Sequence, residues 1–100
     1  MKKTNKIIIT AKEWFDKING NSYFAVKIEL EDKTLFIPFS YGYGDSYYYA
    51  TMELLRKENY LPEKCTAWEF RSYCKDNNIV LSYSIQKKCL KRELKELVIL

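Results

Sequence analysis

The chain has 100 residues, carries 17 Lys or Arg against 13 Asp or Glu for a net charge of +4, and contains no His. This length suits one domain with one hydrophobic core, so we expect residues 1–100 to form a single domain. The absence of His excludes Ser-His and Cys-His nucleophile pairs and H-E-x-x-H metal sites, and no pair of carboxylates stands out. We therefore expect neither an enzyme nor a bound cofactor or metal.

The three cysteines, Cys65, Cys74 and Cys89, are odd in number and show no C-x-x-C spacing. This pattern indicates neither a disulfide framework nor a zinc site, and it is typical of buried structural thiols in a reducing cytoplasm. No apolar run approaches the length of a signal-peptide core or a membrane span. The sequence thus predicts a cytoplasmic protein without a membrane partner.

Residues 1–5 are a basic start that we expect to be frayed, and the β-branched run at 6–10 predicts a first strand. Thr10 and Glu13 have the T-x-x-E spacing of a capping box, which predicts a short helix over 11–19 that a glycine ends. The inward face of this helix would carry Trp14, Phe15 and Ile18.

Residues 22–31 alternate between two sets of side chains more regularly than any other segment, which predicts a strand. One face would be core and the other would display Tyr23, Lys27 and Glu29. A short polar connection leads to 34–41, so the two segments predict an antiparallel hairpin in which Leu35, Ile37 and Phe39 share one face. Pro38 lacks a backbone N–H, which indicates a sheet edge or a bulge.

The motif Y-G-Y-G-D at 41–45 joins this strand to a helix expected from residue 46 or 47 to residue 58. Its glycines allow positive φ without a Cβ clash, and Asp45 or Ser46 could accept hydrogen bonds from the first N–H groups of the helix. The motif lacks the G-K-[ST] of a phosphate-binding loop. It therefore predicts a tight turn and not a nucleotide site.

Thr66 and Glu69 repeat the T-x-x-E spacing and predict a helix from 67 to about 76. Two asparagines close that helix. The run 79–85 then alternates again and predicts another strand.

The tail, residues 86–100, is basic and amphipathic. Leu90, Leu94 and Leu97 recur at helical spacing and favour a helix, whereas a strand continued through Cys89 and Leu90 is the alternative. Together the elements predict an α+β domain, in which a small antiparallel sheet of about four strands packs against two to four helices.

Residues 12–23 read KEWFDKINGNSY and residues 37–47 read IPFSYGYGDSY. These stretches resemble a group of small phage and prophage proteins of unassigned role, whose pattern is W-F-x-x-x-x-G-N-x-Y, a strand, and P-F-x-Y-G-Y-G-[DG]-x-Y. The resemblance covers roughly residues 11–55, and the basic segment 87–94 is more loosely similar to the end of that pattern.

The resemblance implies a mobile-element setting, where short non-enzymatic proteins often inhibit host defence. It implies an anti-CRISPR or similar anti-defence protein in the host cell cytoplasm, a monomer or homodimer that binds a host defence effector such as a Cas nuclease or its guide-RNA complex. A plain DNA mimic is not expected, because such a protein should be strongly acidic.

The residues expected to contact this partner are amphipathic tyrosines around the glycine turn and cations of the tail. They are Tyr41, Tyr43, Tyr47, Lys87, Lys88, Lys91 and Arg92. The alternative function is that of a phage accessory protein that binds nucleic acid, with exposed aromatic rings stacked on bases and basic termini near phosphates.

Overall fold

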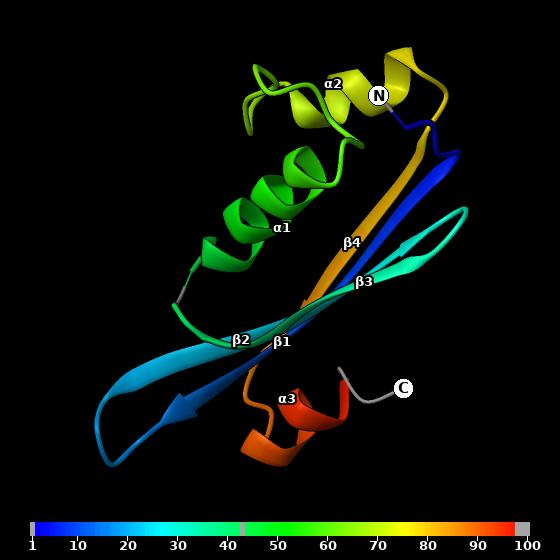
Figure 1. Cartoon of the computed structure of the whole chain (residues 1–100). Coiled ribbons are helices and arrows are strands. Elements are labelled where there is room, and N and C mark those ends of the chain that lie inside the picture. The colour runs from blue at the N-terminus through cyan, green and yellow to red at the C-terminus, as the bar shows by residue number, and fades with distance from the viewer. Residues whose placement is uncertain (1, 43, 98–100) are drawn as a thin grey trace.

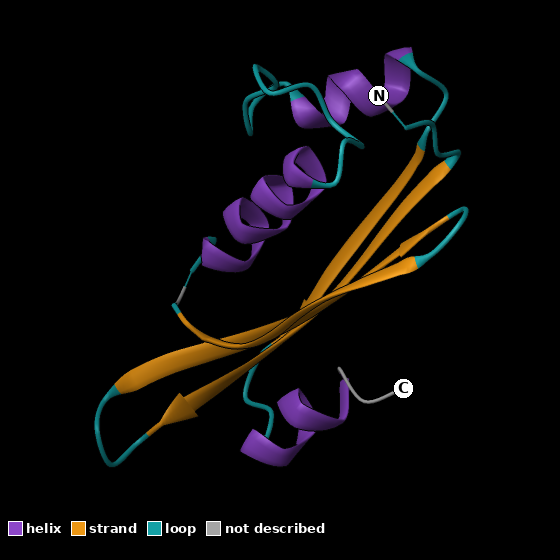
Figure 2. Ribbon diagram, viewed as in Figure 1, coloured by secondary structure: helices purple, strands orange, loops and turns teal. Residues whose placement is uncertain are grey.

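The computed structural model describes residues 2–42 and 44–97, and these residues form one four-stranded sheet between helices (Figure 1, Figure 2). The strands are β1 (Lys6–Asp16), β2 (Asn21–Leu30), β3 (Thr34–Tyr41) and β4 (Val80–Gln86), in the sheet order β3-β2-β1-β4. The helices α1 (Ser46–Lys57) and α2 (Phe70–Asp76) lie on one face of the sheet and α3 (Lys91–Leu97) lies on the other. The predicted α+β class is confirmed.

The sheet is mixed and not purely antiparallel. β2 pairs antiparallel with both β1 and β3, whereas β4 pairs parallel with β1, from Lys6 opposite Val80 to Lys12 opposite Gln86. The connection from β1 to β4 passes through the hairpin and two helices, so the parallel pairing joins distant parts of the chain. None of the helices in the described part is long and apolar enough to cross a membrane.

The helix predicted over 11–19 is wrong, because this segment continues β1. β1 pairs with β2 along its whole length, from Ile7 opposite Leu30 to Asp16 opposite Asn21. The strand that begins at Lys6 gains backbone hydrogen bonds to β2 as it continues through this segment. These hydrogen bonds outweigh the preference for a helix that a single T-x-x-E motif provides.

The predicted hairpin of β2 and β3 is confirmed, and β3 is both an edge strand and bulged. Phe24 lies opposite Ser40, but Val26 lies opposite Ile37, so β3 has one extra residue between these pairs, at Pro38 and Phe39. A bulge reverses which face the following side chains occupy. Phe39 therefore points to the α3 face, and the expectation that it shares a face with Leu35 and Ile37 is wrong.

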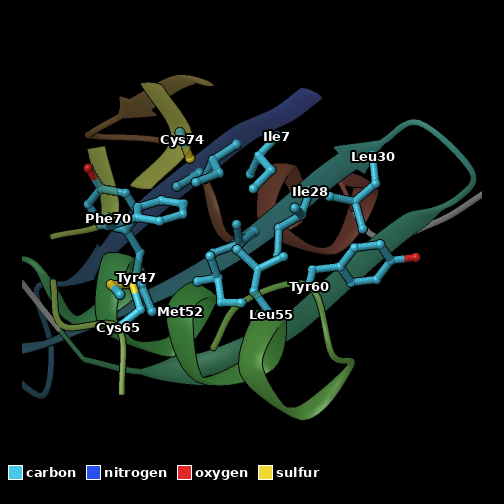
Figure 3. Packing of buried hydrophobic residues seen from close by; sticks show 14 of the residues in the cluster. Ile7, Ile28, Leu30, Tyr47, Met52, Leu55, Tyr60, Cys65, Phe70 and Cys74 are labelled. Carbon is cyan, nitrogen blue, oxygen red and sulfur yellow. The ribbon is translucent and has the colours of Figure 1, made fainter. Parts of the chain in front are cut away.

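The main core lies between the sheet and the pair α1 and α2 (Figure 3). The alternating β2 residues Phe24, Val26, Ile28 and Leu30 are all buried there, as predicted. They meet Met52 and Leu55 of α1 and Phe70 of α2. Fully burying one such side chain stabilises the fold by about 1.5 to 3 kcal/mol.

The opposite face of β2 is not simply displayed to solvent. Ala25 is 0% exposed, because α3 packs over it, and Tyr23 belongs to the same cluster. The expected display to solvent holds only toward the C-terminal end of β2, where the side chains of Lys27 and Glu29 form an ion pair at 3.2 Å. The sheet is consequently covered on both faces near its middle.

The chain turns after the end of α1 and again after the end of α2, and each turn contains an asparagine in the left-handed conformation. Asn59 has φ 65° and Asn78 has φ 56°. In each case the next N–H donates to the carbonyl five residues earlier, Tyr60 to Leu55 at 2.8 Å and Ile79 to Cys74 at 2.8 Å. These are Schellman motifs, which confirm the predicted ends of the two helices.

The expected capping of α1 by Asp45 and the expected start of α2 both differ from the structure. α1 begins after Asp45, as predicted, but the Asp45 side chain makes no capping hydrogen bond. Thr66 Oγ1 accepts the Glu69 N–H at 3.3 Å, as a capping box requires, yet this segment is a turn and α2 begins only at Phe70.

The segment 2–5 is held to the rest of the fold, unlike the frayed start that we expected. The Lys2 N–H donates to the Asn59 carbonyl at 2.7 Å, and Thr4 is buried. Thr4 Oγ1 accepts the Glu31 N–H at 3.0 Å, which ties the start of the chain to the hairpin between β2 and β3.

We predict that Asn78→Ala lowers the free energy of unfolding by about 1 kcal/mol, because alanine is strained at positive φ. Asn78→Gly should match the wild type or exceed it, because glycine adopts this conformation freely. Urea unfolding of the three proteins measures the difference. Equal stabilities for the Ala and Gly variants would contradict the Schellman assignment.

Candidate functional site

The C-terminal helix α3 covers the face of the sheet that α1 and α2 leave open (Figure 1). Lys88 has φ 60° and turns the chain back after β4. The Cys89 N–H then donates to the Glu13 carbonyl of β1 at 3.0 Å. Leu94 of α3 is fully buried with Cys89 and Ala25. These contacts fix α3 over the centre of β1, β2 and β3.

Four aromatic side chains cross this face of the sheet under and beside α3. We call them the aromatic ladder: Trp14 of β1, Tyr23 of β2, and Phe39 and Tyr41 of β3. Trp14 lies opposite Tyr23, and Tyr23 lies opposite Tyr41, so their side chains project from the same face. Ring centroids are 5.6 Å apart for Trp14 and Tyr23 and 4.7 Å apart for Tyr23 and Phe39.

Lys91 of α3 lies above the ladder. Its Nζ is 5.6 Å from the ring centroid of Trp14 and 5.7 Å from that of Phe39. A cation over an aromatic ring is worth about 0.5 to 1 kcal/mol at an exposed site. Lys91 is therefore held at the edge of the ladder while its side chain stays exposed.

Beside the ladder, a groove of about 720 Å³ opens between the tip of the β1–β2 hairpin and the start of α3. Three exposed apolar side chains, Phe15, Ile18 and Leu90, line it. Lys17 and Lys88 also line it. We call these five residues the docking surface. Ile18 is 93% exposed and Leu90 is 53% exposed, so neither is packed within the chain.

Asp16 builds the hairpin tip that presents Ile18. Its Oδ1 accepts the N–H groups of Ile18 at 3.0 Å and Asn19 at 3.3 Å, and its Oδ2 accepts the Asn19 side-chain amide at 2.8 Å. The Asn19 side chain has the largest effect and lowers the pKa of Asp16, the backbone N–H groups lower it further, and burial opposes them. The one carboxylate of the groove is thus occupied within its own turn.

The sequence-predicted contact residues fall into separate places. Tyr41 is 63% exposed at the end of the ladder, but Tyr47 is 8% exposed and belongs to the main core, so its ring is closed to a partner. Tyr43 lies outside the described residues. The predicted cations of the tail are all exposed, namely Lys87, Lys88, Lys91 and Arg92.

The structure brings Tyr41 and Lys91 to one surface through the ladder, and it adds Lys88 through the groove. The basic start of the chain lies elsewhere. Lys2 sits over the Tyr60 ring, on the side of the sheet that carries α1 and α2.

Sequence reasoning missed Phe15 and Ile18, because it placed both on the inward side of a helix. The Asn19-Gly20 pair between two alternating segments was the available signal, since Asn-Gly is a strong marker of a β-hairpin turn. Gly20 has φ 70°, which matches that role.

The cysteines are free and buried, as predicted. Burial raises the pKa of the Cys74 thiol to about 11, and burial is also the main cause that raises the pKa of Cys65 and Cys89. Such thiols are poor nucleophiles at neutral pH. Within residues 2–42 and 44–97, no three His, Cys, Asp or Glu side chains gather closely enough to hold a metal ion.

Comparison of the chain with protein-family models, with curated proteins and with solved structures found no match.

We predict that Leu94→Ala loosens α3 and exposes Trp14. In a Trp68→Phe background, Trp14 emission should move to longer wavelength, because water reaches the indole. The free energy of unfolding should fall by about 2 to 3 kcal/mol. This is the lower part of the range for buried Leu→Ala substitutions, because a short helix can detach locally. Glu96→Ala, at an exposed position of the same helix, is the control. Unchanged Trp14 emission in Leu94→Ala would contradict the packing of α3.

We also predict that the contribution of Asp16 to the stability of the fold depends on pH. Because the folded pKa is lowered, its contribution is present above the ordinary carboxyl value, about pH 4, and is lost as the pH falls through the folded value. Asp16→Asn should unfold at a lower temperature at neutral pH, and its curve should approach that of the wild type in acid. The control is Glu63→Gln at an exposed position. A constant gap between the Asp16→Asn and wild-type curves at every pH would refute this linkage.

Proposed function

We propose that this protein is a non-catalytic binding protein that uses the docking surface to hold an acidic region of another protein. The observation that carries the proposal is the exposure of Ile18, Phe15 and Leu90 around one groove with Lys17 and Lys88 at its rim. An apolar centre with a charged rim is the usual composition of a protein interface.

Charge complementarity selects the kind of partner. Lys17 and Lys88 line the groove and Lys91 lies near it over the Trp14 ring, whereas the Asp16 carboxylate is engaged in its turn. A partner with an apolar side chain flanked by Asp or Glu would bury the groove and face these cations. Such complementarity raises the association rate and selects the partner.

We further propose that the partner is a host defence effector, and that the protein inhibits it by occlusion in the anti-CRISPR manner. This part of the proposal rests on the resemblance to small phage and prophage proteins. Of the resembling pattern, Phe15 belongs to the docking surface and Trp14 lines the same groove, which supports a role for this part of the pattern in binding. Occlusion needs no catalytic group, and a basic inhibitor suits an acidic patch of an effector.

Direct binding of nucleic acid is the weaker alternative. The ladder rings stack on one another at 4.7 to 5.6 Å, and α3 packs over them. Trp14 and Phe39 are only partly exposed beside α3, so a base could cover either whole ring only by displacing the helix. Tyr41 is the ladder ring that remains widely exposed.

The test is capture of partners from a host lysate on the immobilised protein, with and without nuclease, followed by titration of the purified captured protein. Ile18→Glu or Leu90→Glu should weaken that binding at least about 30-fold, the loss of roughly 2 kcal/mol that marks an interface anchor. Trp68→Glu is the matched control, because Trp68 is 94% exposed but lies away from the groove.

Two outcomes would overturn the proposal. One is equal loss of binding in Trp68→Glu and Ile18→Glu, which would place the contact elsewhere. The other is capture that disappears after nuclease, together with single-stranded oligonucleotide binding that weakens steeply with salt, which would favour the nucleic-acid function.

A further inference from the structure

The two edges of the sheet differ in how they meet solvent. β3 carries Pro38 and a bulge, two features that hinder the addition of another strand. β4 reads VLSYSIQ, with neither a charged residue nor a proline. Within the described residues β4 pairs only with β1, so its other edge is open.

The backbone groups that face this open edge can be identified. The Val80 N–H donates to the Asn5 carbonyl, on the β1 side. Because these groups alternate along a strand, Val80, Ser82 and Ser84 face β1, whereas Leu81, Tyr83 and Ile85 direct their N–H and C=O groups outward. An unpaired row of this kind is a template for a further strand.

We propose that β4 pairs antiparallel with β4 of a second copy of this chain, about a two-fold axis at Tyr83. The sequence Leu81-Ser82-Tyr83-Ser84-Ile85 has the same pattern in both directions, apolar, Ser, Tyr, Ser, apolar. A two-fold contact requires this self-complementarity, since each residue meets the residue equally far from the axis.

The register satisfies every outward group. Tyr83 forms a hydrogen-bonded pair with the partner's Tyr83, and Leu81 and Ile85 form such pairs with the partner's Ile85 and the partner's Leu81. On the other face Ser82 lies opposite the partner's Ser84, where the two hydroxyls can hydrogen-bond. The paired strands themselves carry no charged residue, and the cation brought near the axis in each copy is Arg71, which donates to its own Tyr83 hydroxyl at 2.7 Å.

A hollow beside this edge favours the same arrangement. It measures about 370 Å³ and lies between α2 and β4, lined by Arg71, Cys74, Leu81 and Tyr83 among others. The partner's Leu81, the partner's Tyr83 and the partner's Ile85 would project from the face that carries this hollow and cover it. Because the two-fold axis is perpendicular to the sheet, both α3 helices would lie on the same side of the doubled sheet.

The test uses the whole chain and the exposed serines of β4. Sedimentation at increasing concentration up to the millimolar range should show a species of twice the 12.0 kDa chain mass. Ser82→Glu with Ser84→Glu should remain folded by circular dichroism but monomeric, because like charges then face each other across the axis. Ser82→Lys with Ser84→Lys should behave in the same way.

Mixing the acidic and basic variants should restore a dimer that contains one chain of each, because opposite charges then face each other. A wild type that stays at 12.0 kDa throughout would overturn the proposal. Charged variants that remain dimeric, or a mixture that stays monomeric, would overturn it equally. Binding of the captured partner by a monomeric variant tests the docking surface separately.

Discussion

The fold depends on one constraint, which is that β2 is buried on both of its faces around Ala25. Phe24 and Val26 are buried against α1 and α2, while Ala25 between them is 0% exposed under α3. A strand of this kind needs helices on both sides, so the short C-terminal helix is part of the core and not an appendage. The same constraint explains why β1 is long, because it supplies a hydrogen-bonded neighbour along the whole of β2.

The position of the docking surface follows from this arrangement. α3 and the Lys88 turn bring Leu90 next to the hairpin tip, where Asp16 holds Ile18 outward. The ladder beneath α3 acts mainly as packing, and each aromatic pair contributes about 0.5 to 1.5 kcal/mol beyond its buried area. α3 thus covers the aromatic ladder, which could otherwise stack on bases. The residues just before α3 complete the docking surface, which suits a protein partner.

The elements with one clear periodicity could be predicted from the sequence, namely the hairpin of β2 and β3, α1, α2 and β4, whereas for the tail the sequence favours a helix with a strand as the alternative, and the structure has the helix α3. Three features could not. The capping-box spacing of Thr10 and Glu13 competed with strand pairing that only the β2 partner reveals. The bulge at Pro38 moved Phe39 to the second face, and parallel pairing of β4 with β1 has no local signature. Of the expected contacts, Lys88, Lys91 and Tyr41 reach the α3 side, whereas helical periodicity alone could not show that Tyr47 turns inward.

The central claim is that α3 packs over the second face of the sheet, and nuclear Overhauser contacts in solution test it most directly. The account predicts contacts from the Leu94 methyl groups to the rings of Tyr23 and Phe39 and to the Ala25 methyl group, together with slow amide exchange at Ala25. Absence of these contacts, with α3 amides exchanging as fast as in an unfolded chain, would contradict both the two-sided burial of β2 and the docking surface built on it.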